Sequence, residues 1–451
     1  MNTDRTIIRY TSSMCPVCLN RLPAVLERHE DGVYLVKECP EHGVYSTRVW
    51  KDKIDLEDWI AREDPLDEVQ RGQCSGDCRS CTSTHGQDTC CVILEVTGRC
   101  NLRCTYCFAN GGDQTAEPAY EELCAAIEDI AVQGRGPLIQ FAGGEPTMRD
   151  DLPELVRYAK EAGCRYTQIN TNGIRLAEDE EYVSRLAEAG LDIVFLQFDG
   201  CDDEIYRKLR GTDLLETKLR AVTNCDRYRI GVTLVPTVVR GVNDHEIGNI
   251  VRKAAELFPA VRSIHFQPLT YLGRYPGAIS GDHYTLDELM ADLCEQTGIP
   301  EKALLPSRCD HAMCEFHSTF MVSSRRQLIP MTDRAYDTRR ERTPADRNRQ
   351  YVAEHWSRDS SAENALNDAG SIDGEFAEYD PGIPLVTQSS ESMDFNEFTR
   401  RMRTHTLKIS AMAFQDAMNI DLERLYRCSL HVYEDGKLLP FCAKYMTPAR
   451  H

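Results

Sequence analysis

Three cysteines in the run RCNLRCTYCFA have the spacing of an iron–sulfur site with one open coordination position. Cys100, Cys104 and Cys107 follow directly after an apolar segment, residues 92–96. A cubane iron–sulfur cluster normally takes four thiolates, so three leave one iron without a protein ligand. An open position distinguishes catalytic metal sites from closed structural ones. We therefore expect a small molecule to bind this iron, whereas the alternative for three closely spaced cysteines is a zinc knuckle.

A second motif, Gly143-Gly144-Glu145-Pro146, ends the next apolar segment, residues 138–141. Glycines let the backbone approach a ligand closely, and a carboxylate can accept hydrogen bonds from an ammonium group. The pattern CxxxCxxC with an aromatic residue before the third cysteine, followed by GGEP, resembles the radical S-adenosylmethionine (SAM) superfamily over residues 91–274.

The resemblance implies a reaction and a set of ligands. It implies that Cys100, Cys104 and Cys107 hold a [4Fe-4S] cluster, whose open iron the amino and carboxylate groups of SAM chelate. It also implies that GGEP holds the SAM amino group and that Tyr106 lies beside the adenine. The reduced cluster would then cleave SAM to a 5′-deoxyadenosyl radical.

Short apolar runs alternate with amphipathic segments of helical length from residue 91 onward. The candidate strands are residues 92–96, 138–141, 167–170, 193–198, 231–239 and 263–269, and the candidate helices include 120–132, 152–162 and 182–189. This alternation favours βαβ units with a parallel sheet, and it resembles the partial (β/α)6 barrel of the superfamily. Reactive residues gather at the carboxyl ends of barrel strands. We therefore expect the ends of the third and fourth strands to bind the cofactor, through Asn170, Thr171, Asn172 and Asp199.

A polar loop, residues 72–89, repeats the CxxxCxxC spacing with Cys74, Cys78 and Cys81. No apolar run precedes it, no aromatic residue precedes its third cysteine, and Cys90 is available as a fourth ligand. Four thiolates close a cluster, which suits electron transfer or structure. We expect an auxiliary [4Fe-4S] cluster here, with a zinc site as the alternative.

The first cysteines have the spacing CxxC…CxxH of a zinc-ribbon or rubredoxin-like site. Cys15 and Cys18 would be joined by Cys39 and His42 around one metal ion. Spacing does not distinguish iron from zinc, because thiolates accept both metals.

Four later cysteines, Cys309, Cys314, Cys428 and Cys442, could hold a third cluster or could be buried core residues. A three-residue hairpin loop at residues 434–436 would place Cys428 opposite Cys442. Directly opposed residues have Cβ atoms roughly 4.5–5.5 Å apart, close enough to share a metal.

The chain therefore divides into four expected parts. Residues 1–70 form the metal-binding segment, 71–91 the auxiliary cluster loop, 92–275 the partial barrel and 276–451 a C-terminal α+β extension. Within the extension we expect a polar lid or linker at 333–380, one amphipathic helix at 395–420 and a final hairpin at 428–442. The helix prediction rests on helical spacing of Leu407, Ala411, Phe414 and Met418.

Composition restricts the partners. The formal net charge of the 451 residues is −20, which argues against nucleic acid as the main partner, since phosphate binding relies on clustered Lys and Arg. The first residues carry no signal or transit pattern, and no window approaches a membrane span. We expect a cytoplasmic protein, in which clustered cysteines more often bind metal than form disulfides.

A narrower resemblance extends over nearly the whole chain. The runs CPVC…CPEHG, CSGDCRSC, QFAGGEPTMRDDLPELV, FLQFDG and LLPFCAKYMT resemble the radical SAM group that includes tetraether lipid synthases, methanopterin-methylating enzymes and the bacterial protein TrsS. The group implies a mononuclear metal site, one or two auxiliary [4Fe-4S] clusters and an electron donor such as ferredoxin or flavodoxin. Some bacterial relatives carry selenocysteine at the position of Cys442, which makes this residue a reactive-thiol candidate.

The leading hypothesis is a radical SAM enzyme that forms a C–C bond, by coupling or methylation, at an unactivated carbon of a lipid-like or pterin-like substrate. One alternative is a radical SAM enzyme that modifies peptides or other small molecules. The other is a non-catalytic iron–sulfur carrier or sensor, for which GGEP would have no use.

Overall fold

The computed structural model describes residues 5–62, 89–112, 117–277, 279, 281–307, 309–331, 349, 377–387 and 394–449. Cys74, Cys78 and Cys81 lie outside these residues, as does most of the stretch 333–380 expected to form a lid or linker.

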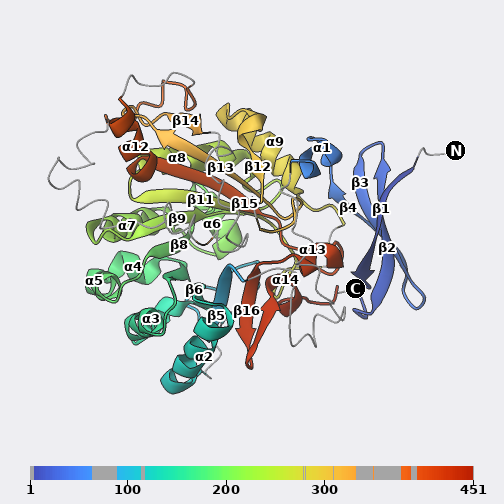
Figure 1. The fold of residues 1–451 in the computed structure, drawn as a ribbon, viewed down its shortest axis with the longest axis horizontal. Helices are drawn as coiled ribbons and strands as arrows, with labels where there is room; N and C mark the ends of the chain where they lie inside the picture. The colour runs from blue at the N-terminus through green and yellow to red at the C-terminus, as the bar shows by residue number, and fades with distance from the viewer. Residues whose placement is uncertain are drawn as a thin grey trace.

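An antiparallel sheet with strand order β1-β2-β3-β4 opens the chain, at the right of Figure 1. Its elements are β1 (Thr6–Met14), β2 (Arg21–His29), β3 (Gly32–Cys39) and β4 (Gly43–Trp50), followed by helix α1 (Leu56–Ile60). Alternate side chains of β2 and β3 are buried, as in strands with one face on a core. Leu26, Leu35, Trp50 and Trp59 belong to the same apolar cluster as the barrel core, so this small sheet is packed onto the rest of the molecule.

A larger sheet has the strand order β12-β13-β15-β11-β9-β8-β7-β6-β5-β16-β17. Its central strands are β5 (Cys91–Thr97), β6 (Leu138–Gly143), β7 (Tyr166–Thr171), β8 (Ile193–Gln197), β9 (Gly231–Val235) and β11 (Val261–Pro268). They pair in parallel, each with the next, as predicted for the partial barrel. The strand expected at 231–239 is divided at Pro236 into β9 and β10 (Thr237–Val238), because proline has no N–H for a sheet ladder.

Strands from the C-terminal extension lengthen this sheet at both edges. The parallel additions are β15 (Thr406–Met412) beside β11 and β16 (Leu430–Glu434) beside β5. The antiparallel additions are β12 (Leu305–Pro306), β13 (Glu315–Val322), β14 (Leu328–Met331) and β17 (Lys437–Pro440). The extension is therefore built into the barrel sheet.

Helices follow the barrel strands and cover the sheet. They are α2 (Tyr120–Gln133), α3 (Leu152–Glu161), α4 (Ile174–Glu178), α5 (Glu180–Glu188), α6 (Asp203–Arg210), α7 (Leu215–Arg227) and α8 (Ile247–Glu256), with short 3-10 turns η2 (Pro146–Met148) and η3 (Asp244–Glu246). Figure 1 shows α2, α3, α4, α5 and α7 along one outer side of the sheet, as in a barrel. The later helices are α9 (Leu286–Thr297), η4 (Glu301–Ala303), α12 (Phe395–Thr404), α13 (Leu422–Tyr426) and α14 (Phe441–Lys444).

The prediction of a single helix at 395–420 is wrong. Helix α12 ends at Thr404, and residues 406–412 form β15, which lies between β11 and β13. Pairing on both sides satisfies the backbone hydrogen bonds of β15. This pairing stabilises a strand here although the apolar side chains have helical spacing.

The final hairpin forms, but its predicted register is wrong by one residue. Glu434 pairs with Lys437, so the loop has two residues, Asp435 and Gly436, with φ of 48° and 76°. Positive φ at both positions is typical of a type I′ turn. Strand β17 ends at Pro440, and Cys442 lies in α14 rather than opposite Cys428 on a strand.

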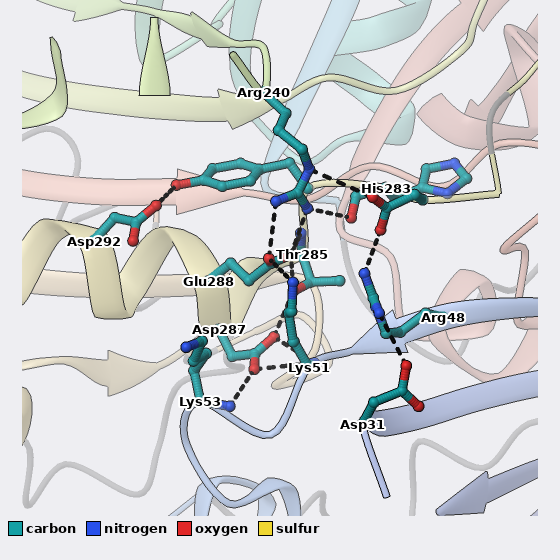
Figure 2. Close-up of polar contacts among 12 residues, drawn as sticks. Asp31, Arg48, Lys51, Lys53, Arg240, His283, Thr285, Asp287, Glu288 and Asp292 are labelled. Carbon is teal, nitrogen blue, oxygen red and sulfur yellow. Dashed lines mark hydrogen bonds and ion pairs between the residues drawn. The ribbon is translucent and has the colours of Figure 1, made fainter. Parts of the chain in front are cut away.

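The N-terminal sheet is held to the barrel by buried polar contacts near the start of α9 (Figure 2). The carboxylate of Asp287, which is fully buried, accepts hydrogen bonds from the backbone N–H groups of Lys51 (3.1 Å) and Lys53 (2.9 Å). Glu288 pairs with Lys51 (3.0 Å) and with Arg240 (2.9 Å). The end of β4 is therefore fixed to α9 through two adjacent acidic side chains.

Replacing Asp287 by alanine should destabilise this docking. Two backbone N–H groups would lose their buried acceptor, which predicts a loss of about 1–3 kcal/mol in the free energy of unfolding. Urea unfolding would measure this loss. The matched control is Asp213→Ala, which removes only an exposed ion pair with Arg207. Equal stability of the two variants would contradict the role of Asp287.

Candidate active site and metal sites

The cluster cysteines lie at the carboxyl-terminal edge of the barrel sheet. Cys100, Cys104 and Cys107 occupy the loop after β5 and line a cavity that opens to solvent and has an empty volume of about 1040 Å³, the open part included. Burial raises the pKa of Cys100 to about 12, and the charges of Glu145, Cys104 and Cys107 add to this shift. Three such thiolates need a cationic partner to be stable together, and an iron–sulfur cluster supplies one. The donor set fits the cluster expected from the sequence.

Arg274 holds the cluster loop in place. Its backbone exchanges two hydrogen bonds of 2.9 Å with the backbone of Cys107. Its side chain donates to the carbonyls of Cys104 (3.2 Å) and Gly111 (2.8 Å). Arg274 was not expected from the sequence, because an arginine after the last barrel strand belongs to no motif.

The two glycines of GGEP allow a close backbone contact with the segment that leads into the cluster loop. The N–H of Gly144 donates to the carbonyl of Thr97, and the N–H of Glu145 donates to that of Arg99, both at 2.7 Å. A Cβ on Gly144 would lie 2.1 Å from the oxygen of Arg99, and one on Gly143 2.3 Å from the oxygen of Thr97. The sequence had suggested a close approach to a ligand, and in the structure the glycines make room for the chain itself.

Glu145 joins the loops that follow β6 and β7. Its Oε1 accepts hydrogen bonds from Thr147 Oγ1 and Thr171 Oγ1, both at 2.6 Å, and its Oε2 accepts one from the backbone N–H of Asn172 at 2.7 Å. The amide of Asn172 in turn donates to Asn101 in the cluster loop at 2.7 Å. A carboxylate oxygen can accept about two hydrogen bonds, so Oε2 retains capacity for a further donor.

Asp199 contacts the cavity indirectly, through an ion pair with Arg210. Asp199 is fully buried and forms a bidentate salt bridge with Arg210, with both N–O distances at 2.7 Å. Arg210 lines the cavity, and its guanidinium interacts with the side chain of Cys104. Asp199 was expected from the sequence, whereas Arg210 was not. Among the described residues that line the cavity, Arg210 is a buried cation. A buried aspartate at the end of a strand needs a cationic partner, so the sequence position of Asp199 could have indicated a nearby arginine or lysine.

Most of the other residues predicted to contact the cofactor lie at the cavity. Tyr106, Asn170 and Thr171 line the cavity, and Tyr106 packs against an apolar cluster that includes Leu209 and Val239. Pro146 is buried at the start of η2, next to Glu145, and fixes the turn after the glycines.

The structure brings together the metal ligands predicted in the N-terminal sheet. One ligand atom from each of Cys15, Cys18, Cys39 and His42 lies within 4.8 Å of the others. His42 Nδ1 is 3.4 Å from Cys39 Sγ and 3.7 Å from Cys15 Sγ. Cys15 and Cys18 come from the β1–β2 turn, Cys39 is the last residue of β3, and His42 lies in the β3–β4 turn. This Cys3His set fits one tetrahedral zinc ion.

The structure also describes the four later cysteines that were expected to hold a third cluster or to be buried core residues. The thiol of Cys309 interacts with that of Cys90 and lies 3.3 Å from Ser429 Oγ. Burial raises the pKa of Cys428, as do the nearby charges of Asp310, Cys442 and Cys314. Ser429, the next residue, contacts Cys309 and Asp310, so the segment with Cys428 lies against the segment with Cys309.

The site and the fold agree with the comparisons to known proteins. A family model described as the radical SAM superfamily matches residues 94–254, and a model described as the HMPTM N-terminal zinc ribbon domain matches residues 7–51. A 7,8-dihydro-6-hydroxymethylpterin dimethyltransferase of Methanocaldococcus jannaschii is 33% identical over 96% of this chain and 92% of its own length. The chain belongs to the radical SAM superfamily.

Other radical SAM proteins match over shorter stretches. A probable GTP 3′,8-cyclase of Methanothermobacter thermautotrophicus is 33% identical over 47% of this chain and 68% of its own length. Among solved structures, methylornithine synthase is 17% identical and covers 56% of this chain and 79% of its own, with a TM-score of 0.37. This radical SAM enzyme has no described helix that is long and apolar enough to cross a membrane.

Gly144→Ala should prevent assembly of the SAM-binding cluster. The added methyl group would collide with the carbonyl of Arg99, so the loop that carries Cys100 would move away from GGEP. We expect about four fewer iron atoms per chain after anaerobic reconstitution, as one cubane is lost. Gly281→Ala is the control, because its Cβ would meet nothing within 4 Å. Unchanged iron content in Gly144→Ala would contradict this role.

Removal of a ribbon ligand gives a separate test. The purified protein should contain about one zinc per chain, and Cys39→Ser should lose it while the iron content stays unchanged. Metal analysis by mass spectrometry measures both metals. Cys294→Ser, on α9, is a matched control and should keep its zinc. Zinc retained in Cys39→Ser would show that the metal lies elsewhere.

Proposed function

We propose that this radical SAM enzyme methylates a pterin-like substrate at carbon. The observation that carries the proposal is the similarity to a pterin dimethyltransferase, which runs through the zinc ribbon, the barrel and the C-terminal extension alike. Methylation is one of the two C–C bond-forming reactions that the sequence suggested, and a pterin one of the two substrate classes.

The cavity residues suit the binding of SAM. Cys100, Cys104 and Cys107 would hold the [4Fe-4S] cluster, which with SAM bound supplies a 5′-deoxyadenosyl radical able to abstract hydrogen from an unactivated carbon. Arg210 is the buried cation for the SAM carboxylate, and Oε2 of Glu145 can accept a hydrogen bond from the SAM ammonium group. Tyr106 offers a flat apolar face for the adenine.

The C-terminal extension supplies an apolar cover for the cavity. Phe414 and Phe441 line it and stack on each other with ring centroids 4.3 Å apart. Phe108 and Tyr445 pack beside them, with centroids 4.9 Å apart. An aromatic cover of this kind excludes water, and a reactive radical needs that protection from side reactions.

The other cysteines suit auxiliary clusters. Cys90 would complete a four-thiolate site with Cys74, Cys78 and Cys81, and Cys309, Cys314, Cys428 and Cys442 would hold a further cluster. All of these donors are sulfur, which favours iron–sulfur clusters over hard metal ions. A radical SAM enzyme also needs a reductant, and ferredoxin or flavodoxin is the proposed donor.

The test is an anaerobic assay of the reconstituted enzyme with dithionite, SAM, 6-hydroxymethylpterin and a reduced one-carbon carrier. Mass spectrometry should detect 5′-deoxyadenosine and a methylated pterin, with the methyl group traced by labelling SAM and the carrier in turn. Cys107→Ala should lose both products, because it removes a cluster ligand, whereas Cys294→Ala should retain them.

Other outcomes would favour the other candidates. Formation of 5′-deoxyadenosine with modification of an added lipid, and not of the pterin, would contradict a pterin substrate. No 5′-deoxyadenosine from enzyme with an intact cluster would favour an iron–sulfur carrier.

A further inference from the structure

A second cavity lies inside the barrel, next to the one lined by the cluster cysteines. This lumen cavity has an empty volume of about 770 Å³, space open to solvent included. It is lined by residues from the amino-terminal halves of the strands, such as Leu138, Gln140 and Gln168. Asn170, Phe414 and Phe441 line both cavities. An occupant of the lumen cavity would therefore lie against an occupant of the cluster cavity.

The lumen cavity has a neutral hydrogen-bonding wall. Gln140 and Gln168 lie opposite each other on β6 and β7, and Gln168 Nε2 donates to Gln140 Oε1 at 2.6 Å. His265 follows on β11, with its Nδ1 2.8 Å from Ser410 Oγ, and burial lowers the pKa of His265 to about 4. The imidazole is thus uncharged at neutral pH, like the two amides.

Gln168 presents an acceptor for a ligand. The side chain is 2% exposed, and within the part of the chain that the structure describes its Oε1 has no hydrogen-bond partner. An unsatisfied buried oxygen is costly, so such a group usually has a partner in the functional state. The amide pair therefore offers a donor–acceptor edge in the lumen.

The other lining residues include aromatic side chains, two carboxylates that already accept hydrogen bonds, and Cys90 and Gln267. Phe195 and Phe414 line the cavity and can pack against a flat ring. At the far end, Asp310 accepts hydrogen bonds from Ser429, and Glu315 accepts one from Ser307. No lysine or arginine is among the described residues that line the lumen cavity, so a phosphate would find no cation there.

We propose that the lumen cavity binds the substrate, and that Gln168 and Gln140 recognise the hydrogen-bonding edge of its pyrimidinone ring. This inference rests on the proposed pterin substrate and assigns its site. A pyrimidinone edge carries amino and imino donors beside a carbonyl acceptor and is neutral, which matches an amide pair. An alkyl chain would leave Oε1 of Gln168 without a partner, so the wall discriminates against the lipid substrates that the sequence also allowed.

The test is equilibrium dialysis of 6-hydroxymethylpterin against the reconstituted holoenzyme. Gln168→Met keeps the length of the side chain and removes its oxygen, so binding should weaken at least about tenfold. Formation of 5′-deoxyadenosine from SAM without substrate reports separately on the cluster cavity, which Gln168 does not line. The matched control is Gln133→Met on the surface of α2, which should bind as the unmutated enzyme does.

Each outcome separates this inference from the proposed function. If the unmutated enzyme binds no pterin, the pterin assignment fails. If it binds the pterin and Gln168→Met binds equally well, the lumen assignment is overturned and the pterin substrate stands. Should Gln168→Met fail to fold, hydrogen exchange of β7 in the unmutated enzyme decides: slower exchange on addition of the pterin supports the lumen site, and no change overturns it.

Discussion

The hydrogen bonds of Glu145 are the interaction on which the candidate active site depends. One carboxylate joins the GGEP loop to the loop after β7, and Asn172 extends the connection to the cluster loop. Backbone hydrogen bonds of Gly144 and Glu145 to residues 97 and 99 connect the GGEP loop to the end of β5 as well. Three loops from three consecutive strands thus keep a fixed separation, which a cluster with three protein ligands requires before it can accept SAM.

The N-terminal sheet is connected to this site through a buried lysine. Lys37 is 2% exposed, and its Nζ donates to the carbonyl of Ala417 (2.9 Å) and to Ser13 Oγ (3.1 Å). Burial lowers the pKa of Lys37 to about 8, and the opposing charge of Asp416 limits the shift. Asp416 also accepts a hydrogen bond from the backbone of Tyr271, beside the cavity. The zinc ribbon therefore helps to set the position of the segment that carries Phe414.

Much of the fold and site followed from the sequence, because the signals were local. Strands of the barrel are short apolar runs bounded by helices, and both metal motifs have fixed spacing. The predictions that were wrong or absent concern contacts between residues far apart in the sequence. Residues 406–412 form a strand because β11 and β13 flank them, and Cys309 lies beside Cys90 because β16 brings Ser429 there. Arg210 and Arg274 were missed since their roles arise from hydrogen bonds to distant backbone and carboxylate groups.

The parallel pairing of β16 with β5 has a consequence for biogenesis. The partner of Val92 is His431, so the first barrel strand keeps an open edge until nearly all of the polypeptide has been synthesised. At ribosomal rates of about 5–20 residues per second, this interval lasts roughly 20 to 70 s. During that time the sulfur ligands of the nascent chain lack their aromatic cover. Iron delivery is therefore best timed after release from the ribosome, when the last strand has docked.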